Sequence, residues 1–184
     1  MRVITGQAKG HKLKVPKRAA TRPATSLVRG AIFSILEAMT DNWNVVLDLF
    51  SGSGSLGIEA LSRGADWVDF VEQEPKCCGI IKENLGKTKL AGKAHVYCCS
   101  ANKALSFLNK EYGIILMDPP YSDVSIGKMI TKIANSTLVG TDSVLVVTHS
   151  PRLSLDPTYT TLNFVKEHRH GDSCIAIYRQ GRIS

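Results

Sequence analysis

The sequence contains no apolar run long enough to cross a membrane. No stretch of its 184 residues approaches the roughly 18 consecutive apolar residues that a membrane-spanning helix requires. The opening residues, MRVITGQAKG, contain no apolar segment followed by a cleavage site, so we expect no signal peptide. These absences predict a cytoplasmic protein without a membrane partner. The length fits one compact domain, and 43% hydrophobic residues suffice for a core.

The few cysteines form no recognisable framework. Two adjacent pairs and a single residue are present: Cys77, Cys78, Cys98, Cys99 and Cys174. Adjacent cysteines rarely bridge each other, no C-x-x-C occurs, and the spacing fits neither a zinc motif nor a disulfide set. We therefore expect small buried thiols and no metal site. His149, which ends the fifth predicted strand, is interpreted as a hydrogen-bonded strand-end residue rather than a substrate contact.

Acidic residues are absent from the first 30 positions. Eight of the 23 lysines and arginines lie there, so this segment carries +8, the rest of the chain −1 and the whole chain +7. Residues 2–6 and 10–15 predict two short strands, the second with lysines alternating with apolar residues. We expect residues 1–20 to form a basic β-hairpin extension. Its charge favours a polyanionic partner, and a solvated tail that binds nothing is the alternative.

Beyond this extension, strands alternate with helices. A helix begins after Thr25 or Ser26 and carries apolar residues at helical spacing through Met39. The strands that follow are predicted at residues 45–50, 67–72, 94–99, 112–118, 143–149, 163–170 and 173–179. Such alternation predicts an α/β fold with a mostly parallel sheet and helices on both faces. Only Gly171 and Asp172 separate the last two strands, and such a tight hairpin makes the last strand antiparallel.

A glycine-rich loop follows the first of these strands. In DLFSGSGSLG, Gly52, Gly54 and Gly57 match G-x-G-x-x-G between a strand and a helix. Glu72 ends the next strand, where a carboxylate can bind both ribose hydroxyls of an adenosine. A nicotinamide dinucleotide would use the same residues. Asp48 distinguishes between these two candidate ligands. A carboxylate at this loop repels a pyrophosphate but suits the cationic aminoalkyl sulfonium of S-adenosylmethionine.

The fourth strand runs into the tetrapeptide Asp118-Pro119-Pro120-Tyr121. Ligands of open α/β sheets bind beyond the carboxyl ends of the strands, so this corner shares a crevice with the glycine loop. The prolines remove N–H donors, which leaves the Asp118 carboxylate and the Pro119 carbonyl to accept the two hydrogens of an exocyclic base amine. Tyr121 can stack on the extruded base. This corner predicts methyl transfer to such an amine, and a structural turn with a core tyrosine is the alternative.

Five segments, in this order, resemble the bacterial 16S rRNA guanine-N2 methyltransferases: TRPATSLVRGAIFSIL, VLDLFSGSGSLGIEALSRGA, FVEQE, MDPPY and HRHGDSCIAIYR. The resemblance covers nearly the whole chain. It implies a Rossmann-like class I methyltransferase domain at residues 21–184 with a seven-stranded sheet, and an N-terminal hairpin that helps to hold RNA. It also implies the cofactor S-adenosylmethionine, no metal, and 16S rRNA or the small ribosomal subunit as partner. We expect a monomer.

The resemblance implies roles for individual residues. The cofactor set comprises Asp48, Phe50, Ser51, Gly52, Ser53, Gly54, Glu72, Gln73, Ser100, Ala101 and Asp118. The catalytic set comprises Asp118, Pro119, Pro120 and Tyr121, and Lys9, Lys12 and Arg22 would lie towards RNA. The basic character of the N-terminal segment adds His11, Lys14 and Arg29 to the expected RNA-binding set. Ser100 stands where the family usually has an acid for the adenine amine, so Asn102 or a backbone carbonyl is the expected substitute.

Three other functions fit parts of this pattern. An adenine-N6 methyltransferase would use the same Asp-Pro-Pro-Tyr corner on DNA or RNA. A non-enzymatic RNA-binding assembly factor would use the basic segment and retain a vestigial cofactor site. A dehydrogenase would need the glycine loop to bind a nicotinamide cofactor, which Asp48 disfavours.

Overall fold

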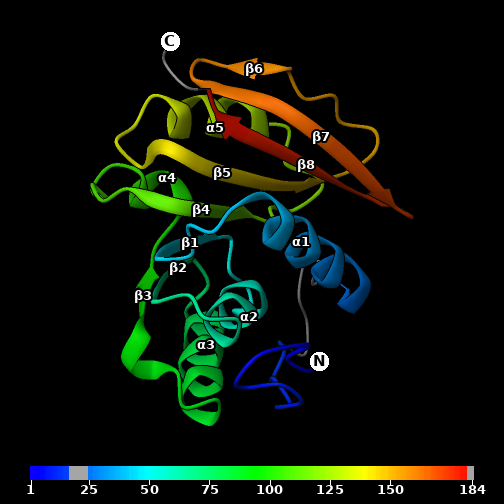
Figure 1. The fold of residues 1–184 in the computed structure, drawn as a ribbon. Helices are drawn as coiled ribbons and strands as arrows, with labels where there is room; N and C mark the ends of the chain where they lie inside the picture. The colour runs from blue at the N-terminus through cyan, green and yellow to red at the C-terminus, as the bar shows by residue number, and fades with distance from the viewer. Residues whose placement is uncertain (17–24, 182–184) are drawn as a thin grey trace.

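The structure is a computed structural model that describes residues 1–16 and 25–181. Its centre is a sheet with the strand order β3-β2-β1-β4-β5-β8-β7-β6 (Figure 1). The strands are β1 (Val45–Leu49), β2 (Trp67–Glu72), β3 (Ala94–Cys98), β4 (Tyr112–Met117), β5 (Val139–His149), β6 (Thr158–Tyr159), β7 (Leu162–His170) and β8 (Ser173–Gln180). The helices are α1 (Ser26–Met39), α2 (Ser55–Ser62), α3 (Pro75–Lys87), α4 (Ala101–Ala104) and α5 (Ile126–Ala134).

The sheet is parallel from β3 through β5 and antiparallel beyond. β8 runs antiparallel to both β5 and β7, which confirms the predicted direction of the last strand. The strand order reverses between β1 and β4, and this reversal is the position where doubly wound sheets bind ligands. The described sheet has one strand more than the seven predicted, because β6 extends the edge beside β7. Its two residues are too few to show an alternating pattern.

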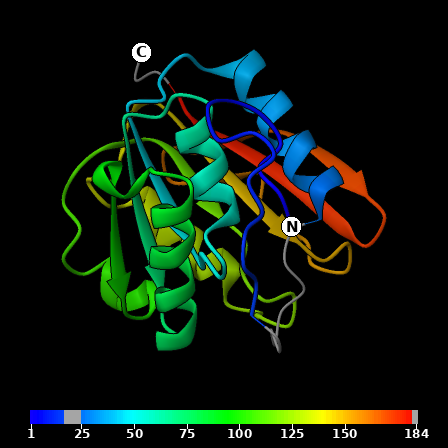
Figure 2. The same cartoon turned by 90° about the horizontal axis from the view of Figure 1, so that it is seen from below.

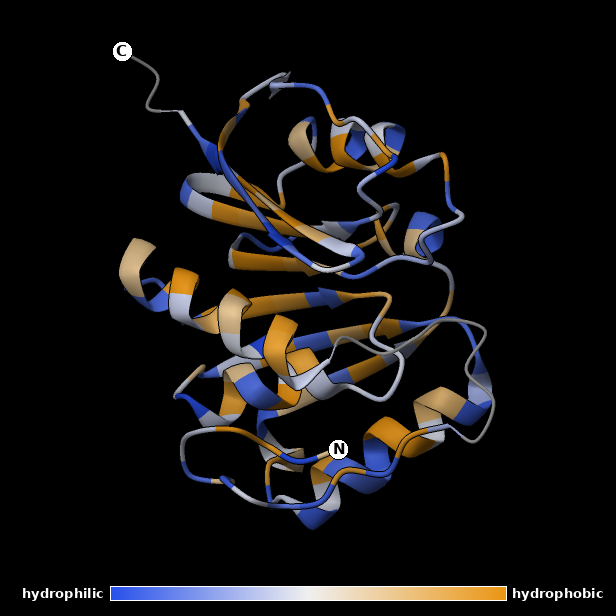
Figure 3. Ribbon diagram, turned by 90° about the vertical axis from the view of Figure 1, so that its right-hand side faces the viewer, coloured by the Kyte–Doolittle hydropathy of each residue, from blue (hydrophilic) through white to orange (hydrophobic). Residues whose placement is uncertain are grey.

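Side-chain alternation along the central strands builds a core on each face of the sheet. Val46 and Ile114 belong to a cluster with apolar residues of α1, α2 and α3. Their neighbours Leu47 and Ile115 belong to a second cluster with residues of α4 and α5. Helices therefore lie on both faces, as predicted (Figures 1 and 2), and the central strands are largely hydrophobic (Figure 3). No helix in the described part of the chain is both long and apolar enough to span a membrane.

The predicted N-terminal hairpin is a looser structure than two paired strands. Over residues 1–16 the only strand-type pairing is one antiparallel bridge between Arg2 and Lys12. The backbone N–H groups of Ile4 and Thr5 donate to the carboxylate of Glu59 in α2, at 2.8 and 3.0 Å, rather than to a partner strand. The alternating pattern could not predict this arrangement, because a side chain from a helix distant in sequence can accept the backbone hydrogen bonds that a partner strand would otherwise accept.

This N-terminal segment, residues 1–16, packs against the rest of the domain. Val3, Ala8 and Leu13 are buried within the α1–α3 cluster. The Asn84 side chain of α3 accepts from the Lys14 N–H at 2.8 Å and donates to the Lys14 carbonyl at 2.9 Å. The segment is therefore anchored to α2 and α3 and shares their core. Residues 17–20 of the predicted extension lie outside the described residues.

Candidate active site

Three carboxyl groups meet at the carboxyl edge of the sheet. Asp48 is in β1, Glu72 ends β2, and Asp118 follows β4, so neighbouring strands carry all three. Asp48 is fully buried. Burial raises the pKa of Asp48 to about 8 against the effect of the Gly57 N–H bond, and the charges of Asp118 and Glu72 add to the rise. Because a nearby cation would favour the ionised form of these carboxyl groups, this concentration of acids suits a cationic ligand.

The glycine loop wraps around Asp48. One carboxylate oxygen, Oδ2, accepts from the Gly57 N–H at 2.9 Å, while Oδ1 is buried and has no hydrogen-bond partner among the described residues. A buried acceptor without a hydrogen bond destabilises the folded protein. A ligand that donates a hydrogen bond to Oδ1 would therefore be bound more tightly. Phe50 and Gly52 have φ angles of +62° and +56°, which turn the chain sharply after β1.

The three glycines of the motif serve different purposes. A Cβ on Gly52 would meet no described atom within 4 Å, so this position opens outward. Gly54 has φ +75° and caps α2 in the left-handed conformation. A Cβ on Gly57 would overlap the ring of Phe70 in β2, so this glycine lets helix and strand pack closely. Only Gly52 thus fits the expected close approach to a ligand, and the other two shape the loop.

Backbone contacts hold most of the predicted cofactor residues in place. The Ser51 hydroxyl donates to the Asp48 carbonyl at 2.6 Å and accepts from the Val71 N–H at 3.0 Å, so it ties β1 to β2. The Ser53 carbonyl accepts from Asn84 at 3.0 Å. The two Glu72 oxygens accept from the N–H groups of Gly52 and Glu74, each at 2.8 Å. A carboxylate oxygen accepts more than one hydrogen bond, so Glu72 keeps capacity for ribose hydroxyls.

The predicted adenine side of the site lies after β3. Ser100 caps α4 and accepts from the Lys103 N–H at 3.3 Å, and Ala101 is buried behind it. Asn102, the expected substitute for the missing acid, accepts instead from Lys132 of α5 at 2.6 Å. Gln73, on the ribose side, is exposed. The Ser100 and Gln73 positions are therefore open to a ligand, whereas the Asn102 amide is engaged elsewhere.

Two residues that the sequence analysis did not single out orient the Asp-Pro-Pro-Tyr corner. Thr148 of β5 donates its hydroxyl hydrogen to the Asp118 carboxylate. The Tyr121 hydroxyl donates to the Ser173 hydroxyl of β8 at 2.7 Å, and the Tyr121 side chain is 41% exposed. An exposed ring contradicts the alternative of a core tyrosine. Thr148 could have been suspected because it lies at the carboxyl end of the fifth strand, but Ser173 carries no such signal.

Most of the predicted RNA-binding residues that the structure describes are exposed. Lys9, His11 and Lys12 are exposed on the N-terminal segment, and Lys14 is exposed while paired with Glu83 at 2.6 Å. Arg22 lies outside the described residues.

The expectation that Arg29 contacts RNA is wrong. Its side chain is fully buried, lies 3.8 Å from the Glu59 carboxylate and donates to the Arg2 carbonyl at 2.8 Å. Burial lowers the pKa of Arg29, and the charge of Glu59 partly offsets this effect. Arg29 therefore joins α1, α2 and the N-terminal segment, and no surface phosphate can reach it.

The strand reversal, the glycine loop on β1 and the acidic corner after β4 define a Rossmann-like class I methyltransferase fold. Residues 1–179 match the family described as Conserved hypothetical protein 95. The chain belongs to this family.

Relatives across nearly the whole chain agree with the resemblance seen in the sequence. The chain is 36% identical over 183 residues to the Bacillus subtilis protein YlbH, to which an rRNA methyltransferase activity is provisionally attributed; the match covers 98% of this chain and 99% of YlbH. It is 28% identical to the Escherichia coli ribosomal RNA small subunit methyltransferase D, over 98% of this chain and 90% of that protein. The solved structure of the Escherichia coli protein yhhF matches with a TM-score of 0.84 and 27% identity, over 98% and 97% of the two chains.

Proposed function

We propose that the protein transfers a methyl group from S-adenosylmethionine to the N2 amine of a guanine in 16S rRNA. The observation that carries the proposal is the shared sheet edge, where the buried Asp48 under the glycine loop lies next to the strand that leads into Asp118 and Tyr121. The names of the full-length relatives support rRNA as the substrate.

The residues of the glycine loop suit this cofactor. Asp48 has a buried oxygen without a described hydrogen-bond partner, and the Gly52 position is open. Asp48, Glu72 and Asp118 together favour a positively charged ligand. Asp48 would hold the methionine part and Glu72 the ribose. When bound, S-adenosylmethionine supplies a methyl group activated by its sulfonium. A pyrophosphate-bearing dinucleotide would be repelled by the charges of Glu72 and Asp118, and by Asp48 once it ionises, which argues against a dehydrogenase.

The Asp118 corner handles the base amine. A guanine amine is a weak nucleophile because its lone pair is delocalised into the ring. The Asp118 carboxylate and the Pro119 carbonyl accept its two hydrogens, direct the lone pair outward and stabilise the positive charge that develops on nitrogen. Thr148 fixes the orientation of the Asp118 carboxylate. The exposed Tyr121 ring offers a stacking surface for the extruded base.

Lys9, His11 and Lys12 on the N-terminal segment would contact RNA phosphates, because they are exposed and no acid lies within the segment. Lys14 contributes less, since Glu83 already pairs with it.

A transfer assay tests the proposal. The protein is incubated with cofactor labelled on its methyl group and with small ribosomal subunits or free rRNA, and the RNA is digested to nucleosides. We expect label in N2-methylguanosine. Label in N6-methyladenosine would assign the adenine alternative. Absence of label together with no cofactor binding by calorimetry would leave the RNA-binding assembly factor.

A further inference from the structure

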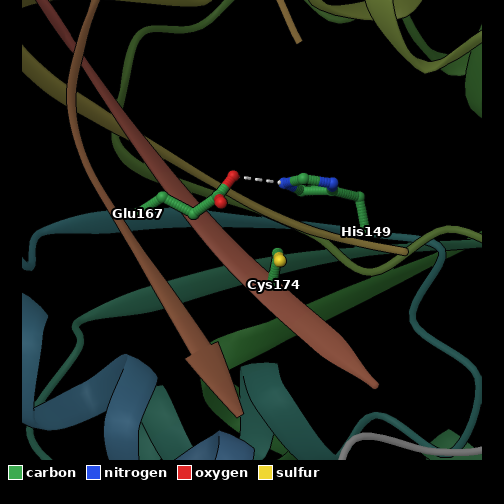
Figure 4. A group of neighbouring side chains, drawn as sticks. All are labelled: His149, Glu167 and Cys174. Carbon is green, nitrogen blue, oxygen red and sulfur yellow. Dashed lines mark hydrogen bonds and ion pairs between the residues drawn. The ribbon is translucent and has the colours of Figure 1, made fainter. Parts of the chain in front are cut away.

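Three potential metal ligands meet on the opposite side of β5 and β8 from the Asp118 corner. His149 ends β5, Glu167 is in β7 and Cys174 is in β8 (Figure 4). His149 pairs with Cys174 in the register of β5 and β8, and Glu167 pairs with Ala176, two residues further along β8. Because side chains alternate along a strand, all three point to the same face. Their ligand atoms lie within 4.8 Å of one another.

Both ring nitrogens of His149 face an oxygen that accepts hydrogen bonds, but a neutral ring has only one N–H to donate. Its Nδ1 lies 3.0 Å from the Ser150 carbonyl and its Nε2 lies 2.9 Å from Glu167 Oε2, and the ring is only 2% exposed. A neutral imidazole carries one N–H. If that N–H is on Nδ1, the Nε2 lone pair faces a carboxylate, and a cation or a second proton is needed between them. Metal-binding histidines commonly donate their other N–H to a backbone carbonyl in this way.

We propose that His149 Nε2, Glu167 Oε2 and Cys174 Sγ bind a divalent transition metal ion of the zinc type. This set of one nitrogen, one oxygen and one sulfur is what Zn²⁺ accepts, and three protein ligands leave a fourth position for water. A neutral imidazole, a carboxylate and a thiolate balance the charge of the ion, and this neutrality suits a site where His149 and Cys174 are buried. The thiol proton of Cys174 passes to solvent on binding.

The surroundings allow Glu167 to adjust its position to an ion. Typical Zn–N and Zn–O bonds imply about 3.4 Å between His149 Nε2 and Glu167 Oε2, about half an ångström more than observed. The Glu167 side chain is 40% exposed and can make this shift. It borders a cleft of about 420 Å³ formed with the 151–157 loop and Phe164.

The charges near Cys174 act in both directions. Burial raises the pKa of the Cys174 thiol and Glu167 adds to the rise, while Arg169, its partner in β7, lowers the pKa. The metal must displace the thiol proton at this sulfur.

Such a site would lie apart from the methyl-transfer corner and would join three strands of the sheet. Thr148 and Ser173, which orient Asp118 and Tyr121, are the immediate chain neighbours of His149 and Cys174. Because alternate residues point to opposite faces, the ion would stay on the far side of the sheet from these contacts. It would cross-link β5, β8 and β7 directly behind the residues that orient the base-binding corner.

The full chain, stripped of metal with a chelator, is titrated with Co²⁺ and then with Zn²⁺. We expect one equivalent of Co²⁺ with a near-ultraviolet sulfur-to-cobalt charge-transfer band, displacement by Zn²⁺, and a higher Tm with bound metal. Cys174→Ser should remove the band, and Glu167→Gln should weaken affinity by about 10-fold or more. Cys98→Ser, an exposed thiol elsewhere, is the matched control and should leave the band unchanged.

The proposal is overturned if the wild-type protein binds no Co²⁺, or if the band persists in Cys174→Ser. It is also overturned if nitrogen NMR shows that His149 Nε2 keeps its proton in the presence of one equivalent of Zn²⁺. In that case His149 Nε2 donates its hydrogen to Glu167 and does not bind the metal.

Discussion

The cofactor edge and the N-terminal segment carry opposite charges in opposite settings. At the edge, Asp48 is fully buried beside two further carboxyl groups. On the segment, Lys9 and Lys12 are exposed on a surface held in place by α2 and α3. Exposed charges are screened beyond about 8 Å at physiological ionic strength, whereas buried charges are screened much less. Cofactor affinity should therefore depend weakly on salt, and RNA affinity should depend on it steeply.

The largest expected effect is at the corner where the two ligands meet. Asp118→Asn should lower kcat for methyl transfer by about 100- to 1,000-fold, because a neutral amide no longer stabilises positive charge on the amine. Cofactor affinity, measured by calorimetry, should change far less. Asp142→Asn makes the same chemical change at a half-buried residue that pairs with Arg179 away from the site, and it should keep full activity. Equal loss in both variants would contradict the role of Asp118.

Asp48 should affect cofactor binding and stability in opposite directions. Asp48→Asn should weaken S-adenosylmethionine binding by about 10- to 100-fold, since a hydrogen bond to a charged group is lost. Wild-type affinity should rise as the pH passes through about 8, where Asp48 ionises in the folded protein. Calorimetry over a pH series, with the variant as control, tests both points. A flat pH profile in the wild-type protein would count against a carboxylate–cation contact.

The same group gives a stability prediction for the cofactor-free protein. The folded pKa of Asp48 is about 8, above its unfolded value of about 4, so the folded state holds an extra proton between these values. The free energy of unfolding should therefore fall as the pH rises from about 4 to about 8, and it should fall less in Asp48→Asn. The difference in Tm between the two proteins across this range measures the effect. Parallel Tm curves would be the contrary result.

Thr148 should have a smaller effect, through the orientation of Asp118. Thr148→Val keeps the shape of the side chain but removes its hydroxyl donor, and kcat should fall by about 10-fold. Thr148→Ser should restore most of the activity, which a role in packing alone does not predict. Steady-state rates for the three proteins, with KM determined separately, distinguish orientation from substrate binding.

The smallest effects are expected for the exposed lysines of the N-terminal segment. Lys9→Ala or Lys12→Ala should weaken RNA binding a few-fold and reduce the slope of log affinity against log salt by about 1 each. Cofactor affinity should not change. Lys128→Ala, an exposed lysine of α5, is the control. Deletion of the whole segment is a poorer test, because it would remove the buried residues Val3 and Leu13 from the core.

The parts of the site that lie in contiguous sequence were predictable, and those that depend on register were not. The glycine loop and the Asp118 tetrapeptide each follow a strand directly, so their spacing alone placed them at the sheet edge. Thr148 and Ser173 reach this corner only through the pairing of β5 with β8. His149, Glu167 and Cys174 likewise come from three strands, and no spacing motif links them.

Arg29 shows the same limit for charge. Its composition-based assignment to RNA failed because its partner, Glu59, lies in another helix. The position of Arg29 in α1 partly indicated its burial. Arg29 precedes the buried Ile32 and Phe33 by three and four positions and so lies on the same face of the helix. The basic hairpin was over-predicted for a related reason, because Glu59 also takes the backbone donors that a partner strand would have used.

The most direct measurement is a map of methylated nucleotides in 16S rRNA from cells that lack this protein. The account predicts that one N2-methylguanine disappears, that the wild-type gene restores it, and that an Asp118→Asn gene does not. Unchanged methylation of every guanine in the small-subunit RNA of such cells would contradict it.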